Sequence, residues 1–211
     1  MKSGENKILL KKIQYFFTVF IKYFNYKIIT GVLFFIIPTI SQAANITLNE
    51  LSVLMSSNNV AEEIHFIENK NLRFLNKPLI LKGRFYFRSS NFLQKNIDKP
   101  FVKVYTLKYN TITFTDKSLE SKILTLKDHP LIYASMKAFY TTMSGNFNTL
   151  KVSYKIELSG TNNQWNLILT PKSKRVLKYI KNVRLSGNYT FIERVVTNEA
   201  NGDSSTIWMI K

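Results

Sequence analysis

The sequence contains no cysteine, and this absence excludes several kinds of chemistry. Without a thiol the chain cannot form a disulfide, use a thiolate nucleophile or bind zinc through sulfur. A lipid-modified cysteine at the N-terminus is excluded for the same reason. Stability outside the reducing cytoplasm must therefore come from the packing of a core.

The sequence also has little that could carry catalysis or bind a metal. Its two histidines, His65 and His129, are far apart, and no Gly-x-Ser-x-Gly elbow, phosphate-cradling glycine loop or His-Glu-x-x-His motif is present. Glu62, Glu63 and Glu68 are close together, but adjacent residues of a strand point to opposite faces, and we interpret all three as solvated charges. We expect no enzyme, no cofactor and no metal site. An enzyme acting on lipids is the least favoured hypothesis, because no nucleophile and base pair can be named.

Acidic residues are scarce: 13 of them face 30 lysines and arginines, which gives a net charge of +17. The excess is uneven, because residues 70–108 contain ten basic residues and one acid, Asp98, and residues 158–192 contain no acid. We therefore expect two basic faces. They suit membrane headgroups or an acidic protein face, and we expect no nucleic-acid partner for an exported chain. A charge that only maintains solubility is the open alternative.

The N-terminal region has the pattern of a signal peptide. Residues 28–40 are uncharged and apolar, follow Lys22 and Lys27, and precede the small residues around Ala43. A helix of thirteen residues rises roughly 20 Å, whereas the hydrocarbon core of a membrane is about 30 Å thick. We expect residues 1–43 to be removed by cleavage after Ala43, which leaves one periplasmic domain, residues 44–211.

Two alternatives to this cleavage remain open. The stretch Ile13–Phe24 is also apolar and makes the leader longer than an ordinary signal peptide. An uncleaved N-terminal anchor or a misassigned start codon would each explain the extra length.

Periodicity predicts a mainly β domain with two helices. Thr47 and Glu50 have the spacing of a capping box, and Leu48, Leu51, Leu54 and Met55 follow at helical intervals. Alternating apolar and polar residues then predict about ten strands, many joined by short turns that indicate antiparallel neighbours. The first two lie around residues 62–68 and 79–88. The others are Phe101–Tyr109, Asn110–Asp116, Leu119–Leu126, Leu150–Ser159, Trp165–Thr170, Val176–Leu185, Tyr189–Asn198 and Ser204–Ile210.

A second helix is expected over about residues 128–142, with Pro130 in its first turn and Gly145 after its end. Its apolar stripe consists of Ile132, Met136, Phe139, Tyr140 and Met143. Methionine and aromatic side chains make such a stripe adaptable, although ordinary core packing is the default interpretation. The economical arrangement is a single curled antiparallel sheet, an incomplete β-barrel, whose apolar concave face is covered by helices.

Several motifs occur in a familiar order. They are Phe66-Ile67-Glu68-Asn69-Lys70, the Pro78-Leu79 step, Gly83-Arg84-Phe85-Tyr86-Phe87, Trp165–Lys172 with its Leu-Thr-Pro-Lys end, and the turn Gly202–Thr206. Together they resemble the LolA-like outer-membrane lipoprotein carriers over most of residues 46–210.

The resemblance implies a monomeric periplasmic carrier, with an incomplete barrel closed by a helical lid over an apolar cavity for acyl chains. The implied partners are an acylated lipoprotein or lipid cargo, an inner-membrane releasing complex, an outer-membrane acceptor and transient contact with membrane surfaces. In carriers of this family an arginine after the second strand ties down the lid. Ser89 occupies that place here and Arg88 is its neighbour, so the resemblance supports lipid binding more strongly than lipoprotein cargo.

On this basis we expect a cavity lined from the sheet and from the lid. The expected sheet residues are Phe66, Leu81, Phe85, Phe87, Trp165, Leu167 and Leu169, and the expected lid residues are Ile132, Met136, Phe139 and Tyr140.

The alternative from another class is a non-transporting envelope protein that docks on an anionic membrane or an acidic partner through its basic faces. Docking through exposed charges should weaken with rising salt, whereas acyl-chain binding should not.

Overall fold

In the computed structural model the described residues are 11–12, 14–16, 18–19, 45–57, 62–88, 92–109, 111–116, 121–125 and 129–210. The chain forms two compact units, Met1–Ala43 and Ala44–Lys211. The apolar segment 28–40 and the expected cut after Ala43 lie outside the described residues, so signal-peptide cleavage stays a prediction. Within the described part of the chain, none of the helices has both the length and the apolar character needed to span a bilayer.

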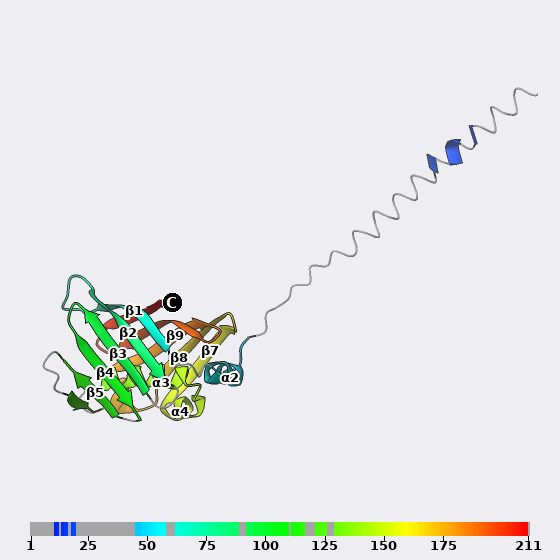
Figure 1. Ribbon diagram of the computed structural model, residues 1–211. Coiled ribbons are helices and arrows are strands. Elements are labelled where there is room, and N and C mark those ends of the chain that lie inside the picture. Colours follow the sequence, from blue (N-terminus) through cyan, green and yellow to red (C-terminus); the bar gives the residue numbers. More distant parts are fainter. Residues whose placement is uncertain are drawn as a thin grey trace, which may run out of the picture. The chain divides into compact units, whose positions relative to one another are not determined.

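The second unit is built on one antiparallel sheet (Figure 1). Its strands are β1 (Glu62–Asn71), β2 (Leu79–Arg88), β3 (Phe92–Lys99), β4 (Lys103–Lys108), β5 (Thr111–Thr115), β6 (Ser121–Leu124), β7 (Tyr154–Thr161), β8 (Gln164–Pro171), β9 (Ile180–Asn188), β10 (Phe191–Glu199) and β11 (Ser204–Ile210). The eleven strands follow the order β6-β5-β4-β3-β2-β1-β11-β10-β9-β8-β7. β6 and β7 are the two ends of this order, so the sheet curls without closing. The expected single curled antiparallel sheet is confirmed.

The strand predictions differ from the structure in three places. β3 was not predicted, because Lys95 lies between the buried Leu93 and Ile97 and interrupts the apolar alternation of its inner face. The strand expected from Leu150 begins at Tyr154, because residues Phe147–Ser153 form helix α4. The strand expected from Val176 begins at Ile180, after the short helix α5 (Lys174–Leu177).

Helix α2 (Leu48–Ser57) begins with the predicted capping box. The backbone N–H of Thr47 donates to the Glu50 carboxylate at 2.7 Å, and the Glu50 N–H donates to Thr47 Oγ1 at 3.3 Å. At the end of α3 (Pro130–Met143), Gly145 has a φ of +66°. A Cβ at this position would clash with the α2 backbone, and Ser52 Oγ donates to the Gly145 carbonyl at 2.7 Å. This close approach joins the two helices.

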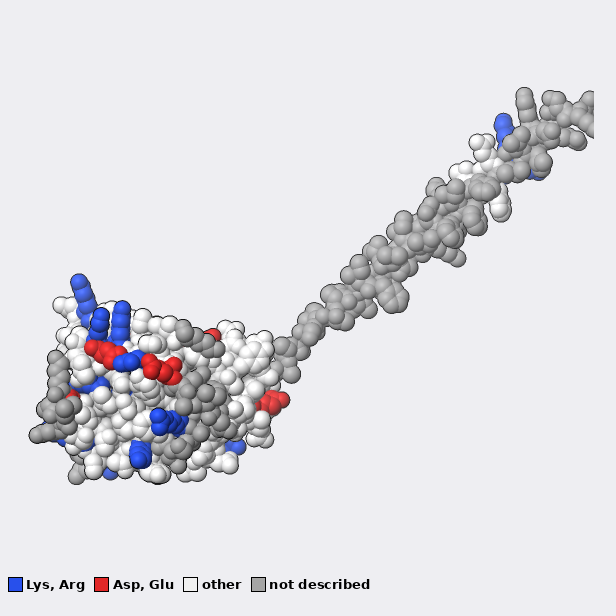
Figure 2. Space-filling view, viewed as in Figure 1, with Lys and Arg blue, Asp and Glu red and all other residues white. Residues whose placement is uncertain are grey.

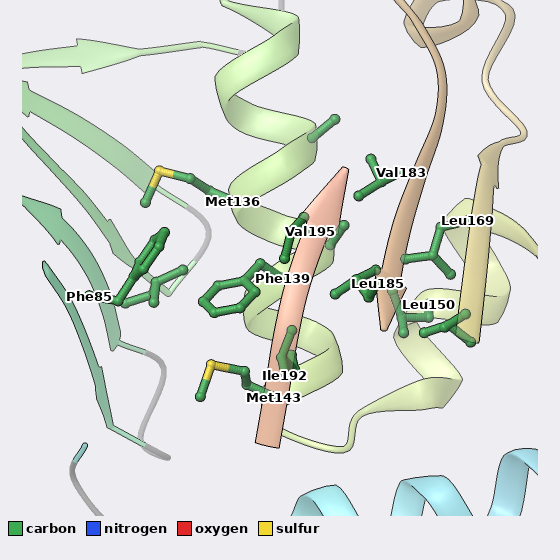
Figure 3. Close-up of a cluster of buried hydrophobic side chains, with 14 of the residues drawn as sticks. Phe85, Met136, Phe139, Met143, Leu150, Leu169, Val183, Leu185, Ile192 and Val195 are labelled. Atoms are coloured by element: carbon green, nitrogen blue, oxygen red, sulfur yellow. The ribbon is translucent and has the colours of Figure 1, made fainter. Parts of the chain in front are cut away.

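Helix α3 lies on the concave side of the curled sheet, between the β2–β5 and β7–β9 parts (Figure 1). The Tyr154 hydroxyl of β7 donates to the Ala134 carbonyl of α3 at 3.2 Å. Figure 3 shows Met136 and Phe139 of α3 directed toward Phe85 of β2, with the side chains of β8, β9 and α4 gathered on the other side of the helix. The helix therefore separates two parts of the interior.

The inner face of β8 is packed solid. Trp165, Leu167 and Leu169 have no exposed surface. The Trp165 ring lies against the backbone of Gly187 on β9, where a Cβ would collide with the ring, and its Nε1 donates to the Tyr189 carbonyl at 2.9 Å. A large apolar side chain thus meets a position that only glycine can occupy.

Candidate functional site

A cavity of about 410 Å³ lies between the inner face of the sheet and residues 130–139 of α3. Its volume falls within the range of pockets that hold small ligands. The lining residues come from β1 to β4, β10 and β11, from α3, and from residues 129 and 179. Those that carry the argument below are Glu68, Lys70, Leu81, Phe85, Lys95, Ile97, Tyr105, His129, Ile132, Ser135, Met136, Phe139, Tyr179, Glu199 and Ser205.

One wall of the cavity is apolar and aromatic. The rings of Phe85 and Phe139 lie 4.9 Å apart, and those of Phe66 and Phe85 lie 4.8 Å apart, both pairs in tilted contact. Met136 adds a flexible thioether beside them, as Figure 3 shows. This wall joins α3 to the sheet and is formed by apolar side chains.

Beside this wall lies a buried ion pair that the sequence analysis missed. Glu68 is 3% exposed, so its interpretation as a solvated charge was wrong. Its carboxylate accepts from Lys95 Nζ at 2.6 Å and from Ser205 Oγ at 2.6 Å. The Lys95 ammonium also lies 5.0 Å from the centre of the Phe66 ring and 5.7 Å from that of Phe85. The pair thus links β1, β3 and β11 at the cavity floor.

The pair changes the titration of the groups around it. Burial raises the pKa of Glu68, but the charges of Lys95 and Lys70 and the two hydrogen bonds outweigh burial, so the net direction is downward. Burial, together with the Glu68 charge, raises the pKa of Tyr105. Glu68 is therefore ionised and Tyr105 neutral at physiological pH, which leaves a phenol as a neutral hydrogen-bonding group in the lining.

The cavity opens to solvent near Tyr179, which is 44% exposed, and near the exposed His129. Lys70 and Glu199 line the cavity close to this opening. Burial, followed by the neighbouring Asp203 charge, raises the pKa of Glu199. The lining contains two lysines, Lys70 and Lys95, and two glutamates, Glu68 and Glu199. Their charges balance, so the cavity as a whole is nearly neutral.

Five of the eleven residues expected at the site line the cavity: Leu81, Phe85, Ile132, Met136 and Phe139. The other six pack outside its lining. They are Phe66, Phe87, Trp165, Leu167, Leu169 and Tyr140. Phe66 contacts Phe85, and the Phe87 ring lies 5.8 Å from that of Tyr140, whereas the three β8 residues belong to the solid core on the other side of α3. Contact of any of these residues with a ligand stays a prediction.

The lining residues that sequence reasoning missed include six on β10 and β11, namely Val195, Thr197, Glu199, Ser205, Ile207 and Met209, and three on β3 and β4. Lys95, Ile97 and Tyr105 line the cavity, and the only sequence signal for Lys95 was a lysine between two apolar residues of like parity. A lysine at such a position interrupts the apolar alternation that predicts a strand. The sequence alone does not show that an acid on another strand pairs with it.

The position expected to hold the lid-tying arginine, Ser89, lies outside the described residues. Arg88 is exposed, and its guanidinium lies 5.8 Å from the centre of the Phe92 ring. On β2 its side chain has the parity opposite to the inward Phe85 and Phe87. Arg88 therefore does not replace an inward-facing arginine.

Comparison with known proteins identifies the family. The family of outer membrane lipoprotein carrier protein LolA-like proteins matches residues 43–209. The chain belongs to this LolA-like family. A search of curated proteins gives no match.

Solved structures that resemble the LolA-like chain are distant in sequence. A LolA superfamily protein of Nitrosomonas europaea is 10% identical, with a TM-score of 0.47 over 79% of this chain and 92% of that one. An outer membrane lipoprotein-sorting protein domain of Vibrio parahaemolyticus is 8% identical, with a TM-score of 0.44 over 77% and 90%. The Pseudomonas aeruginosa MucA/MucB complex is 7% identical, with a TM-score of 0.40 over 77% and 55%.

Proposed function

We propose that this LolA-like protein is a periplasmic carrier. It binds the acyl chains of lipoproteins or related lipids in the cavity under α3 and moves them from the inner to the outer membrane. The observation that carries the proposal is a solvent-accessible cavity with a phenylalanine and methionine wall in a chain of this family. Each methylene of an acyl chain that enters such a site contributes about 0.8 kcal/mol.

The lid of the proposed carrier is α3. Residues 130–139 of this helix supply one wall of the cavity, including Ile132, Ser135 and Met136. Sheet hydrogen bonds hold the strands together, whereas α3 is held by apolar contacts such as that of Phe139 with Phe85 and by one hydrogen bond from the Tyr154 hydroxyl. Movement of the helix therefore leaves the strand ladder intact, and an incoming acyl chain replaces the apolar contacts that the helix gives up.

The buried pair fits the polar end of an acylated ligand. An ammonium carries three donors, and among the described residues Lys95 Nζ has one hydrogen-bond partner, Glu68. Because Glu68 already balances its charge, Lys95 suits a neutral acceptor such as an ester or amide oxygen better than a second anion. Acyl chains of lipoproteins and lipids carry such oxygens at the head of the chain.

The first test measures binding directly. Protein purified from the envelope should release lipid into organic solvent, and the delipidated protein should take up a fluorescent fatty acyl ester. Ser135→Trp places a large ring in the cavity and should abolish uptake. Val152→Trp, on a side chain that is 78% exposed on α4, is the matched control and should leave uptake unchanged. Absence of both bound lipid and probe uptake would count against the proposal.

A second test addresses transport. Delipidated protein is added to donor vesicles that contain a fluorescent acylated peptide, and transfer to acceptor vesicles is followed with time. The protein should accelerate transfer, and the Ser135→Trp variant should not. Uptake that is not followed by delivery would restrict the function to binding.

The alternative without transport predicts a different salt response. If docking through the basic faces is the whole function, association with envelope components should weaken sharply as salt rises, and no acyl probe should be taken up.

The fate of the leader is tested by the intact mass of the exported protein, which should correspond to a chain that begins at Ala44.

A further inference from the structure

Three segments meet at the end of the sheet where the cavity opens. They are the β1–β2 connection (72–78), residues 172–181 around α5, and the β10–β11 turn (199–203). Arg73 N donates to Asp203 Oδ1 at 2.8 Å, and Arg73 Nη1 donates to the Asn201 carbonyl at 2.6 Å. The Ala200 N–H donates to the Tyr179 carbonyl at 2.8 Å. We call these three joined segments the mouth rim.

The mouth rim is strongly basic. Segments 72–78 and 172–181 carry seven basic residues and no acid: Arg73, Lys77, Lys172, Lys174, Arg175, Lys178 and Lys181. All seven are exposed. The acids of the rim are Glu199 and Asp203. Asp203 is buried against Arg73, and the pKa of Glu199 is raised, first by burial. Figure 2 shows Lys and Arg side chains projecting at the end where the β1–β2 connection lies.

The same rim exposes large apolar side chains between its cations. Phe74 is 78% exposed, Leu75 41%, Leu177 38% and Tyr179 44%. An aromatic or leucine side chain among lysines is the arrangement that interfacial membrane segments use, because the apolar groups enter the headgroup boundary while the cations meet anionic lipids. An anionic bilayer offers negative charge and an apolar layer together, whereas a soluble acidic protein would need an apolar pocket placed to receive Phe74.

We propose that the mouth rim docks on an anionic lipid bilayer, with Phe74 and Leu75 entering the headgroup region and the α5 cations lying over lipid phosphates. This orientation points the cavity opening, with Tyr179 and Lys70, at the membrane surface. The inference goes beyond the cavity's proposed role, because it does not depend on what the cavity holds.

Vesicle binding tests the docking. Protein purified from the envelope is floated with vesicles of phosphatidylcholine, alone or mixed with phosphatidylglycerol. Binding should require phosphatidylglycerol and fall as salt rises. Neutralising Lys174, Arg175 and Lys178 to Gln should weaken binding at least about tenfold and flatten its salt dependence. The matched control neutralises Arg88, Lys108 and Lys122, which are exposed on the sheet away from the mouth rim, and should change binding much less.

A positional readout separates the mouth rim from the leader and from charge alone. Because the chain has no cysteine, Phe74→Cys carries a single polarity-sensitive dye. Its emission should shift to the blue on phosphatidylglycerol vesicles. A dye at Tyr109→Cys, 67% exposed in the β4–β5 turn at the opposite end of the sheet, should not shift.

Three results would overturn the proposal. They are equal losses of binding for the two charge variants, equal dye shifts at the two positions, and capture by an immobilised acidic protein without binding to vesicles. None of them bears on acyl uptake in the absence of vesicles, so docking and the cavity function fail independently.

Discussion

The two halves of the sheet's inner face differ in how they are filled. On β8, Trp165, Leu167 and Leu169 are fully buried in a solid core, and α4 packs beside them. On β1 to β3, Leu81, Phe85 and Ile97 are almost as buried but line a cavity. Low exposure alone therefore does not separate core from binding site.

The two halves also differ in the side chains that occupy their inward positions. The inward positions of β8 are all apolar, so close packing satisfies them. The inward positions of β1 and β3 include Glu68 and Lys95, which need hydrogen-bond partners and keep a polar floor under α3. The cavity thus lies where the inward positions carry charged groups, and the solid core lies where they are all apolar.

The largest effect is expected in the packed half. Trp165→Ala removes a fully buried ring and its hydrogen bond to Tyr189, and should lower the free energy of unfolding by about 4 kcal/mol. Urea unfolding followed by circular dichroism measures this loss. Acyl uptake by the folded variant should be unchanged, because Trp165 lies outside the cavity lining. A loss below about 1 kcal/mol would show that this half is not tightly packed.

The buried pair should give the next largest effect. Lys95→Met leaves the Glu68 carboxylate buried with Ser205 as its remaining hydrogen-bond donor, and should cost about 3 kcal/mol. Adding Glu68→Gln removes the uncompensated charge and should recover most of the loss. Urea unfolding of the two single variants and the double variant measures the coupling. Equal stability of Lys95→Met and the double variant would contradict the ion pair.

Acid should weaken the cavity half through Glu68. The pKa of this carboxyl is lowered in the folded state, so its contribution to stability is fully present above its unfolded-state pKa, about 4.3, and is lost as pH falls through the lower folded-state value. The stability difference between the protein and its Glu68→Gln variant should be constant near neutral pH and shrink below about pH 4. Thermal unfolding across this range measures it. A difference that does not change in acid would show that Glu68 is not charged in the fold.

The smallest effect on stability is expected at the cavity wall of α3. Ile132→Ala shortens a half-buried side chain that already borders open space, and should cost about 1 kcal/mol or less. Leu169→Ala, in the packed half, is the control and should cost about 3 kcal/mol. Acyl uptake should respond in the reverse order, weakened by the first change and not by the second. Equal costs for the two variants would remove the distinction between the halves.

Local patterns in the sequence were sufficient for most of the fold. The capping box at Thr47, the strand alternation around Phe85 and the Pro130 helix start are determined by neighbours within a few residues, and all three are confirmed. The missed elements were short or mixed. β3 has a lysine on its inner face, and α4 and α5 are helices of seven and four residues adjoining strands.

The sequence by itself determined which face of a regularly alternating strand such as β2 turns inward, because alternation of apolar side chains fixes that choice within one strand. Only the tertiary structure decided which inward residues pack in the solid core and which line the cavity. That outcome depends on pairs such as Glu68 with Lys95, 27 residues apart on different strands, and on where α3 crosses the sheet. It also decided that Arg73, Tyr179 and Asn201 meet at one opening, since contacts between distant segments are set by strand order and not by any local pattern.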